Sequence, residues 1–223
     1  SEGFNVIPVT TDDLFEIDQL PFGLDSLPAT FSKFRRSVEK NPALVPPLCV
    51  TRPTIPRLTE AAWTDPVKFV VTLSALKPTA MDVPLAGGTD SALVHWSGYL
   101  QARALSHYKA TRNSFSGLHQ SSHLSAWLAH GCLSARQIWH DTLSYEETQG
   151  SNESTYWLRL ELLWREYFRW YSRARDWTLF RFTGPEDRLI SGDQNATRFA
   201  AWSAGVTGCD IVDAGIRELN ATG

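Results

Sequence analysis

Apolar residues recur at helical spacing through the second half of the chain. The run YWLRLELLWREYFRWY places Trp157, Trp164 and Phe168 on one face of a helix that we predict over residues 154–175. The same face carries Glu161, an acid at a position where a core would hold another apolar side chain. Glu161 therefore needs an explanation of its own.

The helical pattern continues on both sides of this run. Leu93, Trp96 and Leu100 lie three or four residues apart, and a short helix is predicted near 124–130. Residues that commonly cap helices precede the predicted segments: Thr89 or Asp90, Ser134, Ser154, Asn195 and Asp210. The alternation that marks strands does not extend over a useful length between residues 87 and 223. This part of the chain is therefore predicted to be all-α.

The first part of the chain has a different character. Eleven of the twelve prolines lie there, and proline removes a backbone donor and restrains the residue before it. One helix interrupts this region in TFSKFRRSVEKN, with Thr30 as its cap and Phe31 and Phe34 on one face. We predict an irregular interdomain connector with one helix over residues 1–85 and a helical domain over residues 86–223.

Composition narrows the classes of function only slightly. Hydrophobic residues make up 43% of the 223-residue chain and charged residues 20%, and its net charge is −3. That charge gives no general attraction to nucleic acid, so DNA binding would need a local patch. No apolar run approaches the ~18 residues that a membrane span requires, so we expect no membrane association and an intracellular protein of open compartment. The three cysteines form no Cys-x-x-Cys pair, which argues against a disulfide framework or a zinc site.

Glu161 has two interpretations at this level. A buried carboxylate must be paired, protonated or hydrated, and Arg165, one turn further on, is a suitable partner for a plain ion pair. Alternatively, Glu161 lies on the floor of a cleft, where Trp164 offers a surface for stacking a flat ligand and the carboxylate accepts its N–H groups. The spacing of the residues leaves both interpretations open.

A serine cluster gives a second candidate site. Ser121, Ser122 and Ser125 lie around the start of a predicted helix, where hydroxyl groups either cap the helix or hold phosphate oxygens. Tyr108 and Arg112, just upstream, could close over an anion. The histidines in this stretch lack a third ligand position, so the sequence predicts no metal site.

Several blocks of this sequence resemble the cryptochrome/photolyase family. They are YKATRNSFSGLHQSSHLSAWLAHGCLSARQIW, STYWLRLELLWREYFRWY and WSAGVTGCDIVDAGIRELNATG. The details DLFEIDQLPF, FSKFRRSVE, YKATRN and STYW favour the cryptochrome DASH branch. The resemblance covers nearly the whole chain. It implies the late connector and the first part of a photolyase-type, all-α FAD-binding domain.

The resemblance also implies a cofactor, a substrate and roles for particular residues. FAD would be held by six residues: Tyr108, Ser121, Ser122, Leu124, Ser125 and Arg165. Glu161 and Trp164 would be the catalytic pair that contacts a flipped pyrimidine dimer in DNA, which reduced and light-excited FAD repairs. By resemblance the activity is that of a deoxyribodipyrimidine photo-lyase, or the protein is a blue-light receptor.

Some features depart from the family pattern. The chain ends at NATG, before the blocks that would complete the flavin pocket, and Cys209, Asp210 and Ile216 replace residues usual in the family. The pocket is therefore expected to be incomplete within this chain, which alone is expected to be inactive. The alternative is a truncated, flavin-free descendant whose open helical face is covered by a protein partner in a larger assembly.

Overall fold

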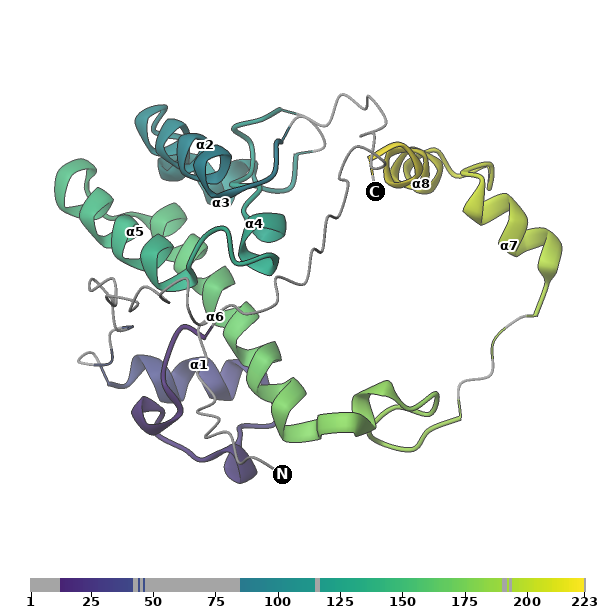
Figure 1. The fold of residues 1–223 in the computed structure, drawn as a ribbon, viewed down its shortest axis with the longest axis horizontal. Coiled ribbons are helices and arrows are strands. Elements are labelled where there is room, and N and C mark those ends of the chain that lie inside the picture. Colours follow the sequence, from purple (N-terminus) through teal and green to yellow (C-terminus); the bar gives the residue numbers. More distant parts are fainter. Residues whose placement is uncertain are drawn as a thin grey trace, which may run out of the picture. The chain divides into compact units, whose positions relative to one another are not determined.

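The computed structural model describes residues 13–41, 44, 46, 85–114, 117–189, 192 and 194–222. Every regular element within these residues is helical (Figure 1). The α-helices are α1 (Phe31–Glu39), α2 (Thr89–Gln101), α3 (Tyr108–Thr111), α4 (Ser125–Ala129), α5 (Ala135–Gln149), α6 (Glu153–Arg175), α7 (Ala196–Ser203) and α8 (Asp210–Thr222). Short 3-10 helices span Ile17–Gln19, Leu24–Ser26, Ala104–His107 and Asp176–Phe180. The predicted all-α class is confirmed.

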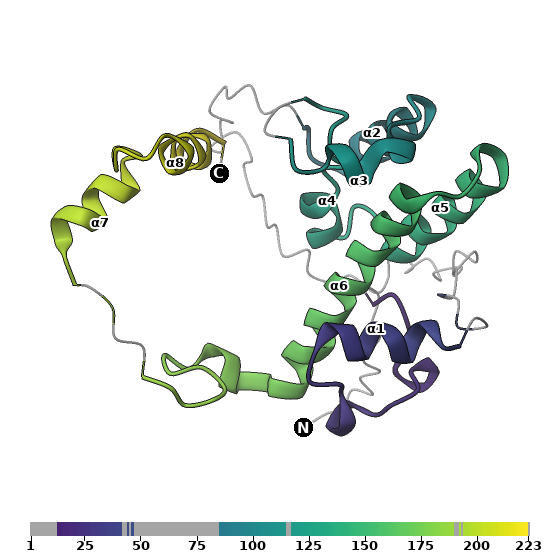
Figure 2. The ribbon, with the colours of Figure 1, turned by 180° about the vertical axis from the view of Figure 1, so that it is seen from behind.

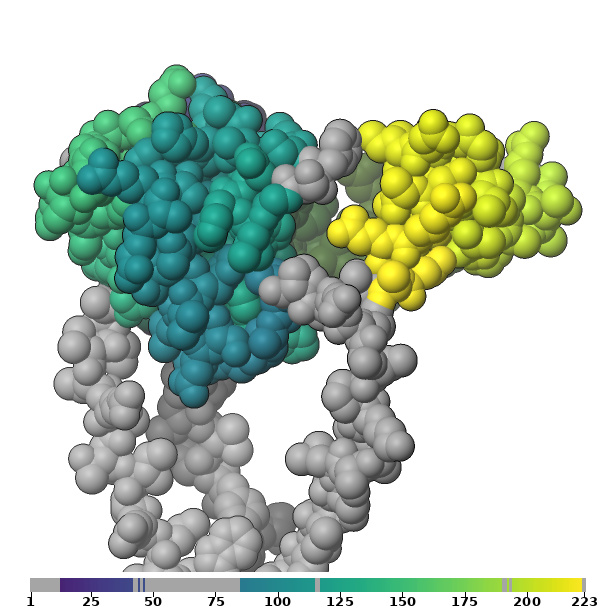
Figure 3. Space-filling model, turned by 90° about the horizontal axis from the view of Figure 1, so that it is seen from above, coloured from purple at the N-terminus to yellow at the C-terminus, as the bar shows by residue number. Residues whose placement is uncertain are grey.

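The described residues divide into two units. The first contains the described residues from 13 to 46 and from 85 to 189, and the second contains the described residues from 192 to 222. In the second unit α7 and α8 pack against each other (Figure 3). Most of the predicted connector between residues 42 and 84 lies outside the described residues, so the division predicted at residue 85 stays a prediction.

Helix α6 organises the first unit. It contacts α1, α3 and α5 (Figures 1 and 2). Helix α1 comes from a distant part of the sequence, whereas α5 directly precedes α6. Its apolar side chains are buried on more than one side, as expected of a helix with neighbours around it. The buried apolar members are Leu158, Leu160, Leu162, Leu163, Tyr167 and Trp170. Residues that point away from these neighbours are the ones available to form a site.

The start of α6 is fixed by a capping box. The side chain of Asn152 accepts hydrogen bonds from the amides of Ser154 and Thr155, and the Thr155 hydroxyl accepts one from the Asn152 amide. The prediction of Ser154 as the cap is wrong. The Ser154 hydroxyl instead accepts a hydrogen bond from the amide of Lys109 at 3.1 Å, so it joins α3 to α6 rather than satisfying its own helix.

A buried carboxylate joins the N-terminal segment to the middle of α6. Glu166 is fully buried and accepts hydrogen bonds from the amides of Leu14 at 2.8 Å and Phe15 at 3.2 Å. The indole N–H of Trp170 donates a third at 2.7 Å. Burial raises the pKa of Glu166, although these three donors act in the opposite direction. The hydrogen bonds satisfy a polar group that would otherwise be costly to bury.

Asp13 supports the same junction through ion pairs. Its side chain is almost completely buried and lies 2.9 Å from Arg169 and 2.5 Å from Arg173, both on α6. Its backbone carbonyl accepts from Arg136 of α5 at 2.7 Å. Burial by itself would raise the pKa of Asp13, but the hydrogen bonds and charges of the two α6 arginines outweigh it and leave the pKa lowered. Asp13 is therefore held ionised.

Replacing Asp13 by asparagine is expected to lower the free energy of unfolding by about 2–3 kcal/mol at neutral pH, because two arginines lose their shared anion. The effect has a defined pH dependence. A lowered pKa in the folded state adds stability above the ordinary pKa, about 3.8 for this group, and that stability is lost as the pH falls through the folded pKa. The free energies of unfolding of Asp13→Asn and the parent, measured in urea, should therefore begin to approach each other below about pH 4 and converge once the pH is below the folded pKa. Asp18→Asn, an exposed match, should behave like the parent throughout; a constant difference at all pH values would contradict the ion-pair explanation.

Candidate functional site

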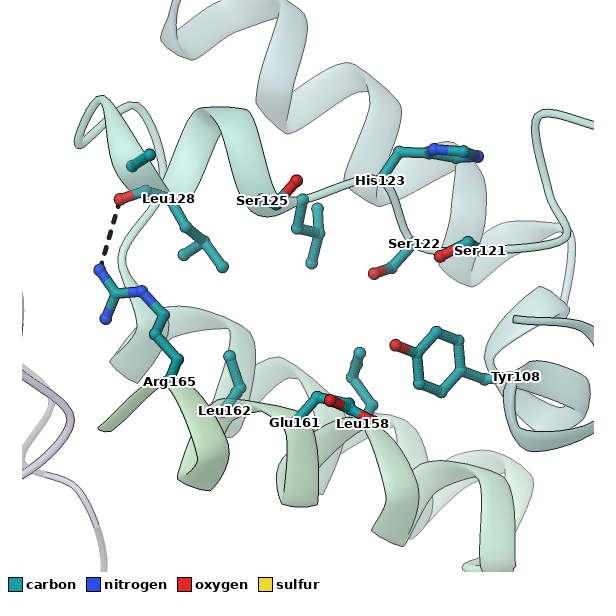
Figure 4. A pocket seen from close by; sticks show the side chains of 12 residues that line it. Tyr108, Ser121, Ser122, His123, Ser125, Leu128, Leu158, Glu161, Leu162 and Arg165 are labelled. Carbon is teal, nitrogen blue, oxygen red and sulfur yellow. Dashed lines mark hydrogen bonds between the residues drawn. The ribbon is translucent and has the colours of Figure 1, made fainter. Parts of the chain in front are cut away.

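A hollow of about 490 Å³ lies beside α6 in the first unit (Figure 4). Its wall comes from α3, from α4 with the segment before it, and from α6. The lining residues are Tyr108, Ser121, Ser122, His123, Leu124, Ser125, Leu128, Ala129, Leu158, Glu161, Leu162 and Arg165. A hollow of this size is in the range of small-molecule and cofactor sites.

The structure brings together seven of the eight residues predicted as site residues. The serine cluster, Tyr108 and Leu124 line one side of the hollow, and Glu161 with Arg165 lines the other. Trp164 is the eighth and is not part of this wall. The roles assigned to these residues stay predictions, but the two groups that the sequence suggested as separate candidates share one cavity.

The segment before α4 is held in a defined shape. The carbonyl of Ser122 accepts a hydrogen bond from His95 Nε2 of α2 at 2.9 Å, and Thr111 Oγ1 donates to the carbonyl of Gln120 at 2.6 Å. His123 follows with a left-handed backbone, at φ 51°, which is uncommon outside glycine. This bend turns the buried side chain of Ser122 toward the hollow (Figure 4).

His95 is the neutral donor that this segment requires. Burial lowers its pKa, and the charges of His123 and His119 act in the same direction, while the hydrogen bond to Ser122 opposes them. A carbonyl oxygen only accepts, so Nε2 carries the proton. The sequence shows nothing that would couple His95 to the serine cluster, because the two lie on different elements.

Tyr108 presents its hydroxyl group to the hollow from α3 (Figure 4). Burial raises its pKa, and the nearby charge of Glu161 raises it further. The phenol therefore stays protonated at neutral pH and can donate a hydrogen bond. Together with Ser121 and Ser122, it makes this side of the hollow rich in hydroxyl donors.

Glu161 is paired, but not with the arginine suggested by helical spacing. Arg112, at the end of α3, places Nη1 2.7 Å from Glu161 Oε1, and the indole N–H of Trp157 donates to the same oxygen at 3.1 Å. Arg165 reaches toward α4 instead, where its Nη2 donates to the carbonyl of Leu128 at 3.4 Å (Figure 4). Helical periodicity identified the face of Glu161 correctly, but its cation comes from another helix.

Trp164 faces α1 rather than the hollow. Its indole is stacked on Phe31, with ring centroids 3.6 Å apart and planes inclined by 15°. Phe168 lies nearly parallel at 5.5 Å. Aromatic pairs in this geometry add to the free energy gained by burial. The indole is therefore already in contact with protein rings, and a ligand in the hollow does not meet its full face.

Other kinds of site receive no support from the described residues. None of the helices in this part of the chain has the length and hydrophobicity to cross a membrane. Its His, Cys, Asp and Glu side chains also form no group of three or more suited to a metal ion.

Comparison with known proteins gives this hollow a context. Residues 157–223 match the family model described as FAD binding domain of DNA photolyase. The cryptochrome DASH of Vibrio parahaemolyticus is 38% identical over 219 residues, which are 98% of this chain and 47% of the relative. The crystal structure of a Synechocystis cryptochrome matches with a TM-score of 0.83 at 33% identity, covering 96% of this chain and 44% of that one. Over nearly its whole length, the chain is similar to part of the proteins of the cryptochrome/photolyase family.

The similarity is to the DASH branch in particular. The cryptochrome DASH of Gloeobacter violaceus is 39% identical over 212 residues, which are 92% of this chain and 42% of the relative. The chain thus spans less than half the length of these curated relatives. The predicted family and the predicted photolyase-type helical fold are confirmed. FAD, the cofactor named by the family model, is the expected ligand.

The residues of the hollow fit part of a dinucleotide. Three hydroxyl groups, from Tyr108, Ser121 and Ser122, gather on one side and are suited to phosphate oxygens. Leu128, Leu158 and other apolar residues form a wall suited to the rest of the ligand. Arg165 adds a cation at the far end (Figure 4). The donor set is chemically compatible with FAD.

Replacing Phe31 by alanine is expected to lower the free energy of unfolding by about 3–5 kcal/mol, because a buried ring is lost and a cavity opens beside Trp164. Phe168→Ala is the matched control: its ring also lies beside Trp164 but is 58% exposed, so the loss should stay below about 1 kcal/mol. Urea unfolding measures both. The 19F resonance of fluorotryptophan at position 164 should move in Phe31→Ala; an unmoved resonance would show that the stack does not exist in solution.

Proposed function

We propose that this chain supplies the phosphate-binding side and the substrate-facing acid of a FAD site that repairs cyclobutane pyrimidine dimers in DNA under light. The observation that carries the proposal is the shared hollow. It joins a set of hydroxyl donors to a carboxylate and an arginine in a chain similar to this family. FAD, when bound, supplies light absorption and electron donation; the protein residues supply binding and orientation.

The hydroxyl side of the hollow is assigned to the cofactor phosphates. The backbone of Ser122 is held by His95, so the position of this residue is fixed before a ligand arrives. Tyr108 stays protonated, since burial raises its pKa, and donates from the same side of the hollow. Ser121, Ser125 and the backbone of Leu124 complete this side. Preorganised donors of this kind strengthen binding because little motion is lost when the ligand binds.

Glu161 is assigned to the DNA lesion. Its carboxylate accepts N–H groups and has no proton to donate while it is paired with Arg112. A damaged pair of bases leaves the duplex at a cost of a few kcal/mol, lower than for intact bases. Trp164 can contact such a ligand only through the part of its indole that Phe31 and Phe168 leave uncovered.

A blue-light receptor and a docking subunit are the other candidates. The receptor would use the same cofactor site without repair. The docking subunit is favoured by the second unit, where α7, α8 and the segment between them leave several apolar side chains exposed: Phe199, Trp202, Val206, Ile211 and Leu219. Flavin absorbance in protein isolated from its source decides between the first two functions and the third. Repair of dimer-containing DNA in blue light then separates enzyme from receptor.

Removing hydroxyl groups from the hollow should weaken FAD binding. Ser122→Ala with Tyr108→Phe is expected to raise the dissociation constant by roughly 10- to 100-fold, because hydrogen bonds to a charged phosphate are lost. Quenching of flavin fluorescence on titration measures the constant. Ser134→Ala, an exposed serine outside the hollow, is the control and should bind like the parent. Equal affinity in all three proteins would rule out the phosphate role.

Removing the acid should affect the lesion rather than the cofactor. Glu161→Ala is expected to reduce dimer repair by roughly 10-fold or more while FAD occupancy is unchanged, because only the acceptor for the lesion is lost. Repair is measured on a dimer-containing oligonucleotide in blue light, and occupancy by flavin absorbance. Glu153→Ala removes an exposed acid of the same helix and should leave both unchanged. Full repair by Glu161→Ala would leave Glu161 as a structural ion-pair partner of Arg112.

A further inference from the structure

The two oxygens of Glu161 are used unequally. Arg112 and Trp157 both bind Oε1, at 2.7 Å and 3.1 Å. Within the described residues Oε2 accepts no hydrogen bond, although the side chain lines the hollow and is about one-third exposed. A carboxylate has acceptor capacity at both oxygens, so one oxygen of this acid is held by protein and the other remains available.

Trp157, one turn before Glu161 on α6, is itself in contact with two cations. The Nζ atom of Lys109 lies 4.9 Å from its ring centroid and the Cζ atom of Arg112 lies 5.6 Å from it, distances typical of cation–π contacts. Lys109 is paired with Glu153 at 3.1 Å. Helix α3 and the residue that ends it are therefore joined to α6 by two ion pairs near the indole.

This arrangement restrains the terminal side-chain torsion of Glu161, which would otherwise rotate easily. The terminal torsion of a glutamate has a broad, roughly two-fold distribution, so an unrestrained carboxylate rotates easily. An ion pair alone would accept either oxygen. The added indole N–H comes from a fixed ring and has one direction, so the two donors together select a single orientation.

We propose that Trp157 and Arg112 are positioning residues that hold Glu161 Oε1 and thereby offer Oε2 to an N–H or O–H donor on a ligand in the hollow. The identity of that ligand as the imide N–H edge of a damaged pyrimidine rests on the function proposed above. A carboxylate fixed in this way selects ligands with a donor edge and disfavours those that present only acceptors. Trp157 thus contributes to specificity without touching the ligand.

Trp157→Phe tests the proposal because phenylalanine keeps an aromatic ring near the two cations but removes the N–H donor, together with the five-membered part of the indole. Arg112→Lys keeps the charge that pairs with Glu161, and Arg112→Gln removes it. Trp177→Phe is the matched control, since Trp177 is 58% exposed and lies on the 3-10 helix after α6. Thermal unfolding of each variant shows whether a change in binding reflects lost structure.

The first measurement needs no ligand. The indole 1H–15N resonance of Trp157, assigned by its loss in Trp157→Phe, should exchange slowly with solvent and shift in Glu161→Ala and Arg112→Gln. In Trp177→Phe it should keep its position. A resonance that does not respond to Glu161→Ala would show that the hydrogen bond is absent in solution and would overturn the proposal.

The second measurement compares binding of an oligonucleotide carrying one cyclobutane dimer with binding of its undamaged match. The ratio of the two affinities should fall roughly 3- to 10-fold in Trp157→Phe and Arg112→Gln, and should be retained in Arg112→Lys and Trp177→Phe. An unchanged ratio in a folded Trp157→Phe overturns the positioning role. If the parent itself shows no preference for the dimer, the proposed function fails, and the indole resonance still decides whether Glu161 is positioned.

Discussion

The first unit depends on one buried carboxylate. Glu166 accepts hydrogen bonds from the amides of Leu14 and Phe15 and from the indole of Trp170. It therefore connects a segment near the start of the described chain to the middle of α6. Asp13 reinforces the contact through two arginines of the same helix. These contacts stabilise the packing of the N-terminal segment against α6, because the helices of that segment are short.

The same helix carries two acids in opposite environments. Glu166 is fully buried, and burial raises its pKa, so its role is to satisfy backbone amides. Glu161 lies a turn and a half earlier, partly exposed to a hollow and paired with Arg112. Rigid attachment of α6 on one side therefore supports the orientation of functional groups on another, as binding sites built on packed helices require.

Periodicity and composition predicted the features that depend on residues close together in the sequence. They gave the all-α class, the face of Glu161 and the serine cluster as a candidate site, because these depend on residues a few positions apart. They did not give the partners of these residues. Arg112 meets Glu161, and His95 meets Ser122, only after separate helices pack together. The pairing of Trp164 with Phe31 was missed for the same reason: spacing fixes the face of a residue but not what lies opposite.

Local competition also limits what the sequence can show. Ser154 and Asn152 are both good caps for α6. The choice between them depends on Lys109, whose amide donates a hydrogen bond to the Ser154 hydroxyl. The amino-acid types at both positions satisfy the same rule, so the rule cannot rank them. Tertiary contacts settled the boundary of α6.

The stack between Phe31 and Trp164 has a consequence for biosynthesis. Phe31 is synthesised long before Trp164, so the apolar face of α1 stays exposed while most of this unit is translated. Closing so large a loop is slow compared with forming a single helix. Nascent chains of this protein should therefore be most prone to aggregate, and most dependent on chaperones, in the interval before α6 emerges.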